Sequence, residues 1–289
     1  MPRAHPHRSR SRPLPAAAAR ERAAPARRGR PDRDALLERL RIRRAHECDR
    51  PHPRTVMDRV VSSHTPTVRA LDHARRRRRA PDPRALVVCV PHAPGTPELR
   101  EVEREAGRVR ARFGEALTLT GSQAVRAAVL RGLGDASHVH FACHGVTDRE
   151  DPSRSRLLVH DHEETPLTVS DIFRLRLEHA ELAYLSACDT ARTPKVPDEP
   201  VHITGAMQIA GYPHVIGTLW NVDDAIAADI ASDFYAELAV PGTEPAGTEP
   251  AGSGAGLPPA AALHAAVRRV RDRYPGAPTL WAAHIHAGA

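Results

Sequence analysis

Two residues of this 289-residue chain have the chemistry of a nucleophile and of a base that could activate it. Cys188 directly follows the aliphatic run ELAYLSA, and His144 comes two residues after the run HVHFA. Both runs are typical of buried strands, and reactive groups in open α/β sheets gather at the carboxyl ends of strands. The thiolate is the reactive form of cysteine, and a nearby imidazole can take its proton. The pattern therefore indicates a thiol nucleophile, Cys188, with His144 as its general base.

Small residues beside both positions fit the same chemistry. Gly145 and Ala187 would let a substrate backbone come close, and the main-chain N–H groups of Gly145 and Cys188 could form an oxyanion hole. Taken singly, however, a cysteine at a strand end is usually a small buried apolar residue, and a histidine is usually a satisfied polar one. Spacing alone leaves this structural alternative open.

The elements that would position these residues alternate between strands and helices from residue 85 onward. We expect strands at residues 85–90, 115–120, 137–142, 156–160, 181–187, 214–219 and 280–286. We expect helices at residues 98–112, 122–132, 168–176, 200–210, 223–238 and 260–274, with Ser122 and Thr168 or Ser170 near two of the starts. Such alternation predicts an α/β fold with a mostly parallel central sheet.

The N-terminal part differs from the rest in composition. Residues 1–80 hold 23 Arg and 8 Asp or Glu, a net of +15, so residues 81–289 carry 7 − 15 = −8 of the total of +7. We expect residues 1–54 to be a disordered Arg/Pro/Ala-rich extension with one short helix, and residues 55–289 to be the folded domain. A duplicated GTEPA predicts a mobile loop at about residues 241–258.

Several classes of function are excluded or disfavoured. The arginine run at residues 75–79 has no interleaved aromatic residues and no zinc-finger or similar signature, so nucleic-acid binding is not expected. No apolar run approaches the roughly 20 residues of a membrane span. Four scattered cysteines indicate a reducing compartment, and we expect a cytoplasmic protein of bacterial type.

A metal centre is the rival reading of the histidines. His138, His140 and His144 form the pattern H-x-H-x-x-x-H, and in a strand the first two would share a face. Metallo-hydrolases usually need an Asp in such a run and more ligands from other loops, and this run has no Asp. We therefore expect neither a metal nor another cofactor.

Four segments resemble the CHAT family of caspase-like peptidases, which are related to separase. They are HFACHG (residues 140–145), LSACDTA (185–191), AGYPHVIGTLWNVDD (210–224) and LWAAHIHAG (280–288), and a weaker match opens at VVSSHTPTVRAL (60–71). The resemblance implies a caspase-like three-layer sandwich, with a mostly parallel central sheet flanked by helices. It also implies a cysteine endopeptidase that works through a thioester acyl-enzyme.

The resemblance assigns roles to individual residues. The His of the HG motif maps to His144 and the Cys of SAC maps to Cys188, and together they would form a dyad without a third carboxylate. Asp223 and Asp224 match the end of the third segment, where related peptidases place acidic specificity residues that would favour a basic P1 residue. The simpler alternative is that the same two aspartates start the following helix as N-caps.

One departure from the family pattern supports a second hypothesis. Members usually open with an extra strand that is not found here, where the sequence is rich in Arg, Pro and Ala. The alternative to a peptidase is a catalytically silent caspase-fold interaction or scaffold module in a regulatory or defence pathway. For the peptidase we expect a protein substrate and a regulatory protein partner, and nothing in the sequence requires an oligomer.

Overall fold

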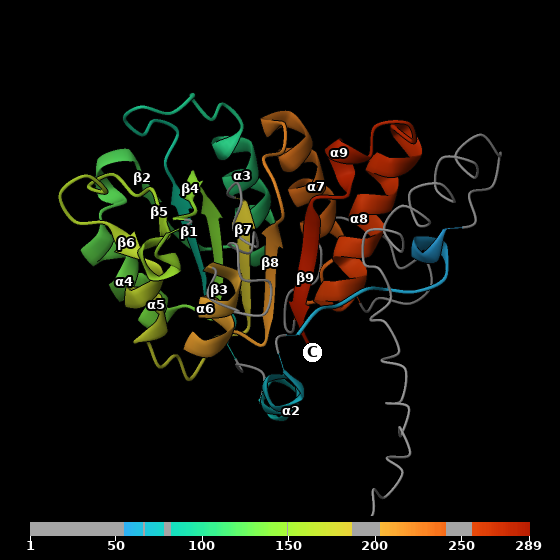
Figure 1. The fold of residues 1–289 in the computed structure, drawn as a ribbon, viewed down its shortest axis with the longest axis horizontal. Coiled ribbons are helices and arrows are strands. Elements are labelled where there is room, and N and C mark those ends of the chain that lie inside the picture. The colour runs from blue at the N-terminus through green and yellow to red at the C-terminus, as the bar shows by residue number, and fades with distance from the viewer. Residues whose placement is uncertain (1–54, 66, 78–81, 149, 187–202, 241–255) are drawn as a thin grey trace, which may run out of the picture. The chain divides into compact units, whose positions relative to one another are not determined.

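A six-stranded sheet with the order β2-β1-β3-β7-β8-β9 forms the centre of the computed structural model (Figure 1). The strands are β1 (Ala85–Cys89), β2 (Ala116–Thr120), β3 (His138–Ala142), β7 (Leu182–Ser186), β8 (His214–Thr218) and β9 (His284–Gly288). All neighbours are parallel except β8 and β9, which confirms the predicted α/β fold with a mostly parallel sheet. The structure describes residues 55–289 except 66, 78–81, 149, 187–202 and 241–255.

The predicted disordered extension, residues 1–54, lies outside the described residues, as does most of the predicted mobile loop, residues 241–255. Among the described helices, none is long and apolar enough to cross a membrane.

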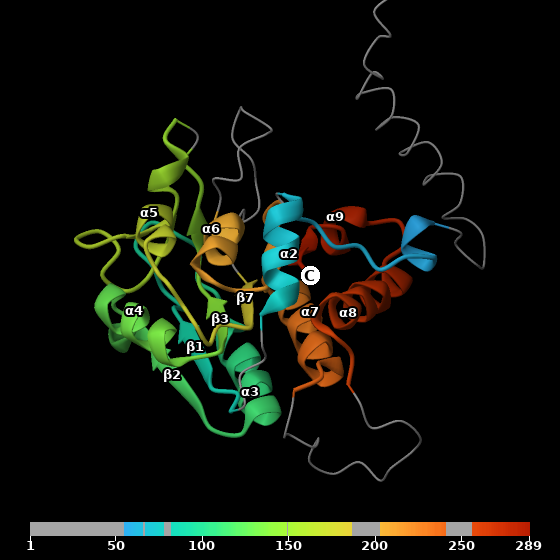
Figure 2. The same cartoon turned by 90° about the horizontal axis from the view of Figure 1, so that it is seen from below.

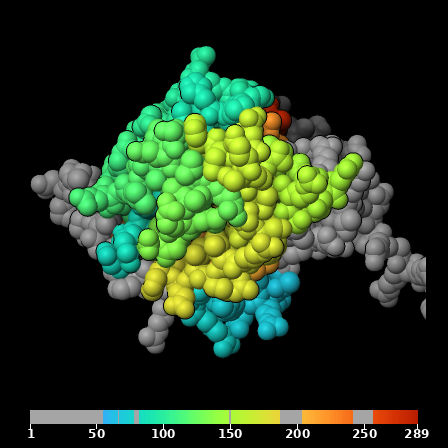
Figure 3. Space-filling model, turned by 90° about the vertical axis from the view of Figure 1, so that its left-hand side faces the viewer, coloured from blue at the N-terminus to red at the C-terminus, as the bar shows by residue number. Residues whose placement is uncertain are grey.

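The central strands are apolar on both faces because helices cover both faces. Every residue of β1 and β3 is buried. One face packs against α3 (Val102–Phe113), α7 (Asp224–Glu237) and α8 (Pro259–Arg273). The other packs against α4 (Arg126–Asp135), α5 (Val169–Phe173) and α6 (Ile203–Ala210). The result is a three-layer sandwich, which Figure 2 shows from below; Figure 3 looks onto the side formed by the α4 and α5 region.

A small antiparallel sheet begins immediately after His144. It consists of β4 (Gly145–Val146), β5 (Arg156–Leu157) and β6 (Leu167–Thr168), in that order. The sequence predicted a strand at residues 156–160, but neither β4 nor β6, since two-residue strands carry no readable alternation. Thr168 caps α5, as predicted, through a capping box with Asp171.

The predicted helix at residues 122–132 is wrong at its start. Gly121–Gln123 forms a short 3-10 turn, η2, and α4 begins at Arg126 after Val125, so Ser122 is not its N-cap. A distant carboxylate replaces the expected cap, because Asp161 Oδ1 accepts a hydrogen bond from Arg126 N at 2.7 Å. A local sequence window cannot reveal a cap that comes from 35 residues away.

The last strand also starts later than predicted. Residues 280 and 281 belong to the short helix α9 (Pro278–Trp281), which has proline at its first position, and β9 begins only at His284. The Trp281 indole holds this turn against the end of α8 by donating to Tyr274 O at 3.0 Å.

The segment before β1 runs beside β9 and covers part of its free edge (Figure 1). His64 N donates to His286 O at 2.9 Å, and Gly288 N donates to His64 O at 2.8 Å. Within the weakly matching segment, residues 60–71, the pairing with β9 consists of this single bridge. It lies between the 3-10 turn η1 (Val56–Asp58) and α2 (Val68–Arg76), whose N-cap Thr67 accepts from Ala70 N. Even one bridge blunts an edge that would otherwise present unpaired backbone groups.

A buried polar network sits between β3 and the helices α3 and α7. His140 is 1% exposed, with Nε2 2.9 Å from Glu105 Oε2 and Nδ1 3.0 Å from the Tyr235 hydroxyl. Its ring also stacks on Tyr184 at a centroid distance of 5.0 Å. Both imidazole nitrogens thus have partners, which is the condition for burying a polar ring at low cost.

Removing one partner from this network should destabilise the domain. We expect Glu105→Ala to lower the free energy of unfolding by about 1–3 kcal/mol, because it leaves a buried imidazole nitrogen unpaired. Urea denaturation followed by circular dichroism measures this difference. Glu103→Ala, on the exposed face of the same helix, is the matched control and should change stability by less than about 0.5 kcal/mol. Equal effects of the two substitutions would contradict a stabilising role for the network.

Candidate functional site

The carboxyl edge of the sheet brings together the ends of the two strands that precede His144 and Cys188. β3 and β7 are neighbours and parallel, with Ala142 opposite Ser186. His144 follows Ala142 by two residues, and Cys188 follows Ser186 by the same number. The chain therefore leaves both strands at one level of the sheet. Cys188 itself lies outside the described residues, so the site is built below from its surroundings.

His144 is held by a backbone carbonyl. Its Nε2 lies 2.8 Å from Pro97 O, and the ring is partly exposed. A carbonyl oxygen can only accept, so the hydrogen bond places the proton on Nε2 and leaves the lone pair on Nδ1. This tautomer gives the neutral ring one nitrogen that can take a proton.

The pairing of β4 with β5 fixes the direction of the Gly145 N–H group. Gly145 is opposite Leu157 in the β4–β5 pair, and Leu158 N donates to His144 O at 2.8 Å. In an antiparallel ladder this pattern makes Gly145 and Leu157 a non-hydrogen-bonded pair. The Gly145 N–H therefore points away from β5, and the ladder does not use it.

The two aspartates of the LWNVDD segment have different surroundings. Asp223 is exposed and caps α7, with Oδ1 accepting from Ile226 N at 3.2 Å. Asp224 is half-buried, and its Oδ2 accepts from Arg100 N at 2.7 Å and from Glu101 N at 3.0 Å. Asp224 thus ties the start of α7 to the loop that carries Pro97.

A small cavity of about 30 Å³ adjoins His144. It is lined by Leu99, Cys143, His144, Ser186, Thr218, Val222, Asp224, Ala227 and His284. Asp224 is part of this lining and Asp223 is not. Ser186, Thr218 and His284 lie at the same edge of three adjacent strands, since Thr218 is opposite His284 in the β8–β9 pair. Neither residue type nor spacing in the sequence marks these three residues or Pro97 as functional.

The three histidines of the H-x-H-x-x-x-H pattern lie in three different environments. His140 belongs to the network with Glu105, His138 lies 2.9 Å from Ser137 Oγ, and His144 bonds to Pro97. Within the described part of the chain, no group of three or more His, Cys, Asp or Glu side chains is arranged to hold a metal ion.

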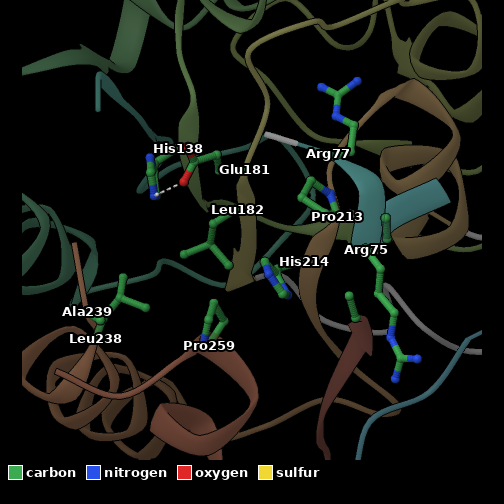
Figure 4. A pocket seen from close by; sticks show the side chains of 12 residues that line it. Arg75, Arg77, His138, Glu181, Leu182, Pro213, His214, Leu238, Ala239 and Pro259 are labelled. Carbon is green, nitrogen blue, oxygen red and sulfur yellow. Dashed lines mark ion pairs between the residues drawn. The ribbon is translucent and has the colours of Figure 1, made fainter. Parts of the chain in front are cut away.

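A larger cavity, of about 280 Å³, opens at the opposite edge of the sheet (Figure 4). His138, Leu182 and His214, the first residues of β3, β7 and β8, line it, and His138 and Glu181 point toward one another at 3.8 Å. Because reactive groups in such sheets gather at the carboxyl ends of strands, this cavity is not the candidate active site.

A protein-family model matches most of the chain. The model of the CHAT domain family matches residues 33–289. No curated protein sequence matches the chain.

Solved structures share the fold at low identity. Saccharomyces cerevisiae separase, in its complex with securin, is 15% identical with a TM-score of 0.51; the alignment covers 78% of this chain and 14% of that one. The Arg-specific cysteine proteinase gingipain R (RgpB) is 10% identical with a TM-score of 0.50, covering 76% and 50%. The complex of the Porphyromonas gingivalis RgpB pro- and mature domains is 12% identical with a TM-score of 0.49, covering 76% and 51%. The matches to separase and to gingipain R, with TM-scores of 0.51 and 0.50, show that the fold is the caspase-like fold.

Buried histidines make the stability of the domain sensitive to acid. Burial lowers the pKa of His138 to about 3, of His286 to about 3 and of His284 to about 4, and a neighbouring His214 adds to the first two shifts. An unfolded histidine takes up its proton near pH 6.5, so below that pH the unfolded chain binds more protons than the folded one. The free energy of unfolding is therefore highest above pH 6.5 and decreases as the pH drops from 6.5 toward 4.

We expect the free energy of unfolding to fall by about 1.4 kcal/mol per pH unit for each such histidine below pH 6. Urea titrations at pH 7, 6 and 5 measure the slope, and His138→Leu should reduce it by about one proton. His73→Ala, at an exposed position, is the control and should leave the slope unchanged. A slope that is the same in the His138 variant would show that this histidine titrates normally when folded.

Proposed function

The chain belongs to the CHAT domain family and has the fold of caspase-like cysteine peptidases, and from this we propose that it is a cysteine endopeptidase that cleaves a specific protein partner. Cys188 is the nucleophile and His144 the general base in this proposal. The observation that carries it is the hydrogen bond from His144 Nε2 to Pro97 O, because it leaves Nδ1 as the proton acceptor at the edge where the strand before Cys188 ends.

The proposed reaction is acyl transfer in two steps. His144 Nδ1 takes the thiol proton of Cys188, and the thiolate attacks the carbonyl carbon of the peptide bond. The C–N bond breaks as His144 returns the proton to the leaving amine, and a thioester remains. Water, deprotonated by His144, then attacks the thioester and releases the carboxylic acid and the thiol.

Backbone groups would stabilise the negative charge that develops on the carbonyl oxygen. We assign this role to the N–H groups of Gly145 and Cys188. The support is the orientation of Gly145, whose N–H points away from the β4–β5 ladder. No step of this chemistry needs a cofactor or a metal ion.

The surroundings of His144 suggest how the site is kept in shape. Asp224 binds the backbone of Arg100 and Glu101, and the same loop supplies Pro97 O to His144. Asp224 also lines the cavity beside His144, which supports its proposed place in the specificity pocket. Asp223 caps α7 outside that lining, so its support for pocket function is weaker.

A regulatory protein partner completes the proposal, because a peptidase with one protein substrate must be kept from cleaving others. We place the protein in the cytoplasm, where a thiol nucleophile stays reduced.

Covalent labelling tests the proposal. Peptide chloromethyl ketones with a panel of P1 side chains, including Arg and Lys, are incubated with wild type, His144→Ala and Cys188→Ser, and the labelled residue is read by mass spectrometry. We expect labelling at Cys188 in the wild type, at least 100-fold slower labelling in His144→Ala, and none in Cys188→Ser. Cys89 is an internal control, since burial raises the pKa of its thiol to about 12.

Two results would contradict the proposed peptidase function. A folded wild-type protein that no member of the panel labels, with or without cell extract to supply a regulatory partner, would favour the scaffold function. Cleavage activity that survives Cys188→Ser would rule out this nucleophile.

A further inference from the structure

One side chain at the cavity beside His144 has no role in the proposed dyad. His284 is the first residue of β9 and is 8% exposed, and it lines the cavity together with His144 and Ser186. Among the described residues, neither of its ring nitrogens has a hydrogen-bond partner. Burying an imidazole in this way costs free energy, and nearly all buried polar groups in folded proteins are paired. The ring therefore lacks two hydrogen bonds that something at the cavity could supply.

The state of the ring defines the chemistry that it can bind. Burial lowers the pKa of His284 to about 4, so the ring is neutral at pH 7. A neutral imidazole offers one N–H donor and one acceptor nitrogen. Such a ring pairs with a group that is itself uncharged and can both donate and accept, as a hydroxyl or a carboxamide does.

The size of the cavity limits the ligand further. About 30 Å³ accommodates one or two water molecules, and hence a hydroxyl or a small amide group. A guanidinium on its three-carbon stem, or an aromatic ring, exceeds this space. Asp224 lies in the lining and disfavours an acidic group by charge repulsion, while its Oδ2 is already engaged by two backbone N–H groups.

We propose that His284 is a specificity-determining residue and that this cavity takes a small uncharged polar side chain, that of Ser, Thr or Asn, from the substrate residue whose carbonyl is attacked. The assignment to a peptide residue rests on the proposed peptidase function. The cavity shares His144 with the proposed dyad, so the side chain nearest the scissile carbonyl is the one that reaches it.

Libraries of fluorogenic peptides, each with one fixed P1 residue and mixed residues elsewhere, test the specificity. We expect kcat/KM of the wild type to be at least 10-fold higher for P1 Asn, Ser or Thr than for Ala, Leu, Lys or Arg. His284→Phe should remove this preference while cleavage after Ala persists. His162→Phe is the matched control, because His162 is equally buried at 8% exposed and lies outside the cavity lining.

A second experiment measures binding in the cavity and does not depend on peptide cleavage. The ring ¹⁵N resonances of His284 are recorded in Cys188→Ala during addition of a small ligand. The ligand is either acetamide, which carries the carboxamide group of Asn, or n-butylammonium, which mimics Lys. We expect saturable shifts with acetamide and none with n-butylammonium. Acetamide shifts in a protein that cleaves no peptide, with or without added cell extract, would contradict the peptidase function and leave the proposed ligand chemistry of the cavity unchanged.

Three results would overturn the proposal. The first is an absence of ¹⁵N shifts with acetamide, which would mean that water alone fills the cavity. The second is a P1 preference that His284→Phe leaves unchanged in a folded protein. The third is a preference for Arg or Lys that Asp224→Asn abolishes, which would make the aspartate, and not His284, the determinant.

Discussion

The parallel, in-register pairing of β3 with β7 is the constraint on which the rest of the site depends. Ala142 lies opposite Ser186, so the chain leaves both strands at the same height, one toward His144 and the other toward Cys188. Both strands are central and flanked by helices on each face, and their residues are buried except for partly exposed Ser186. A slip of one residue would turn every side chain of a strand to the other face, so the packing of both cores fixes this register.

A second layer of contacts holds the loop above this edge. Asp224 accepts two backbone hydrogen bonds from Arg100 and Glu101, and Pro97 from the same loop accepts the Nε2–H of His144. The start of α7 is thus linked through a few hydrogen bonds to the tautomer of the proposed base. The arrangement accounts for an aspartate that begins a helix and also lies at the cavity wall.

Much of the architecture could be predicted from the sequence, because buried parallel strands read as short aliphatic runs between amphipathic helices. ALVVC and LAYLS are such runs, and both form strands where expected. Features made by distant partners could not be read. Asp161 caps α4 from outside the local window, and the two-residue strands β4 and β6 carry no periodicity.

The same distinction applies to the candidate site. His144 and Cys188 are recognisable in the sequence because their residue types suit the chemistry, and Gly145 because it is small. Pro97 acts through a backbone oxygen, which any residue has, so its type gives no signal. His284 sits in an alternating strand where a polar residue looks exposed, and only the structure shows that it is buried against the cavity.

The central claim is that His144 activates the thiol of Cys188, and the pH dependence of alkylation tests it most directly. Iodoacetamide is reacted with wild type and His144→Ala between pH 5 and 10, and modification of Cys188 is followed by mass spectrometry. The account predicts that the wild-type rate reaches its plateau well below the ordinary thiol pKa of about 8.5, and that His144→Ala returns the midpoint to about that value. Identical profiles in the two proteins would contradict it.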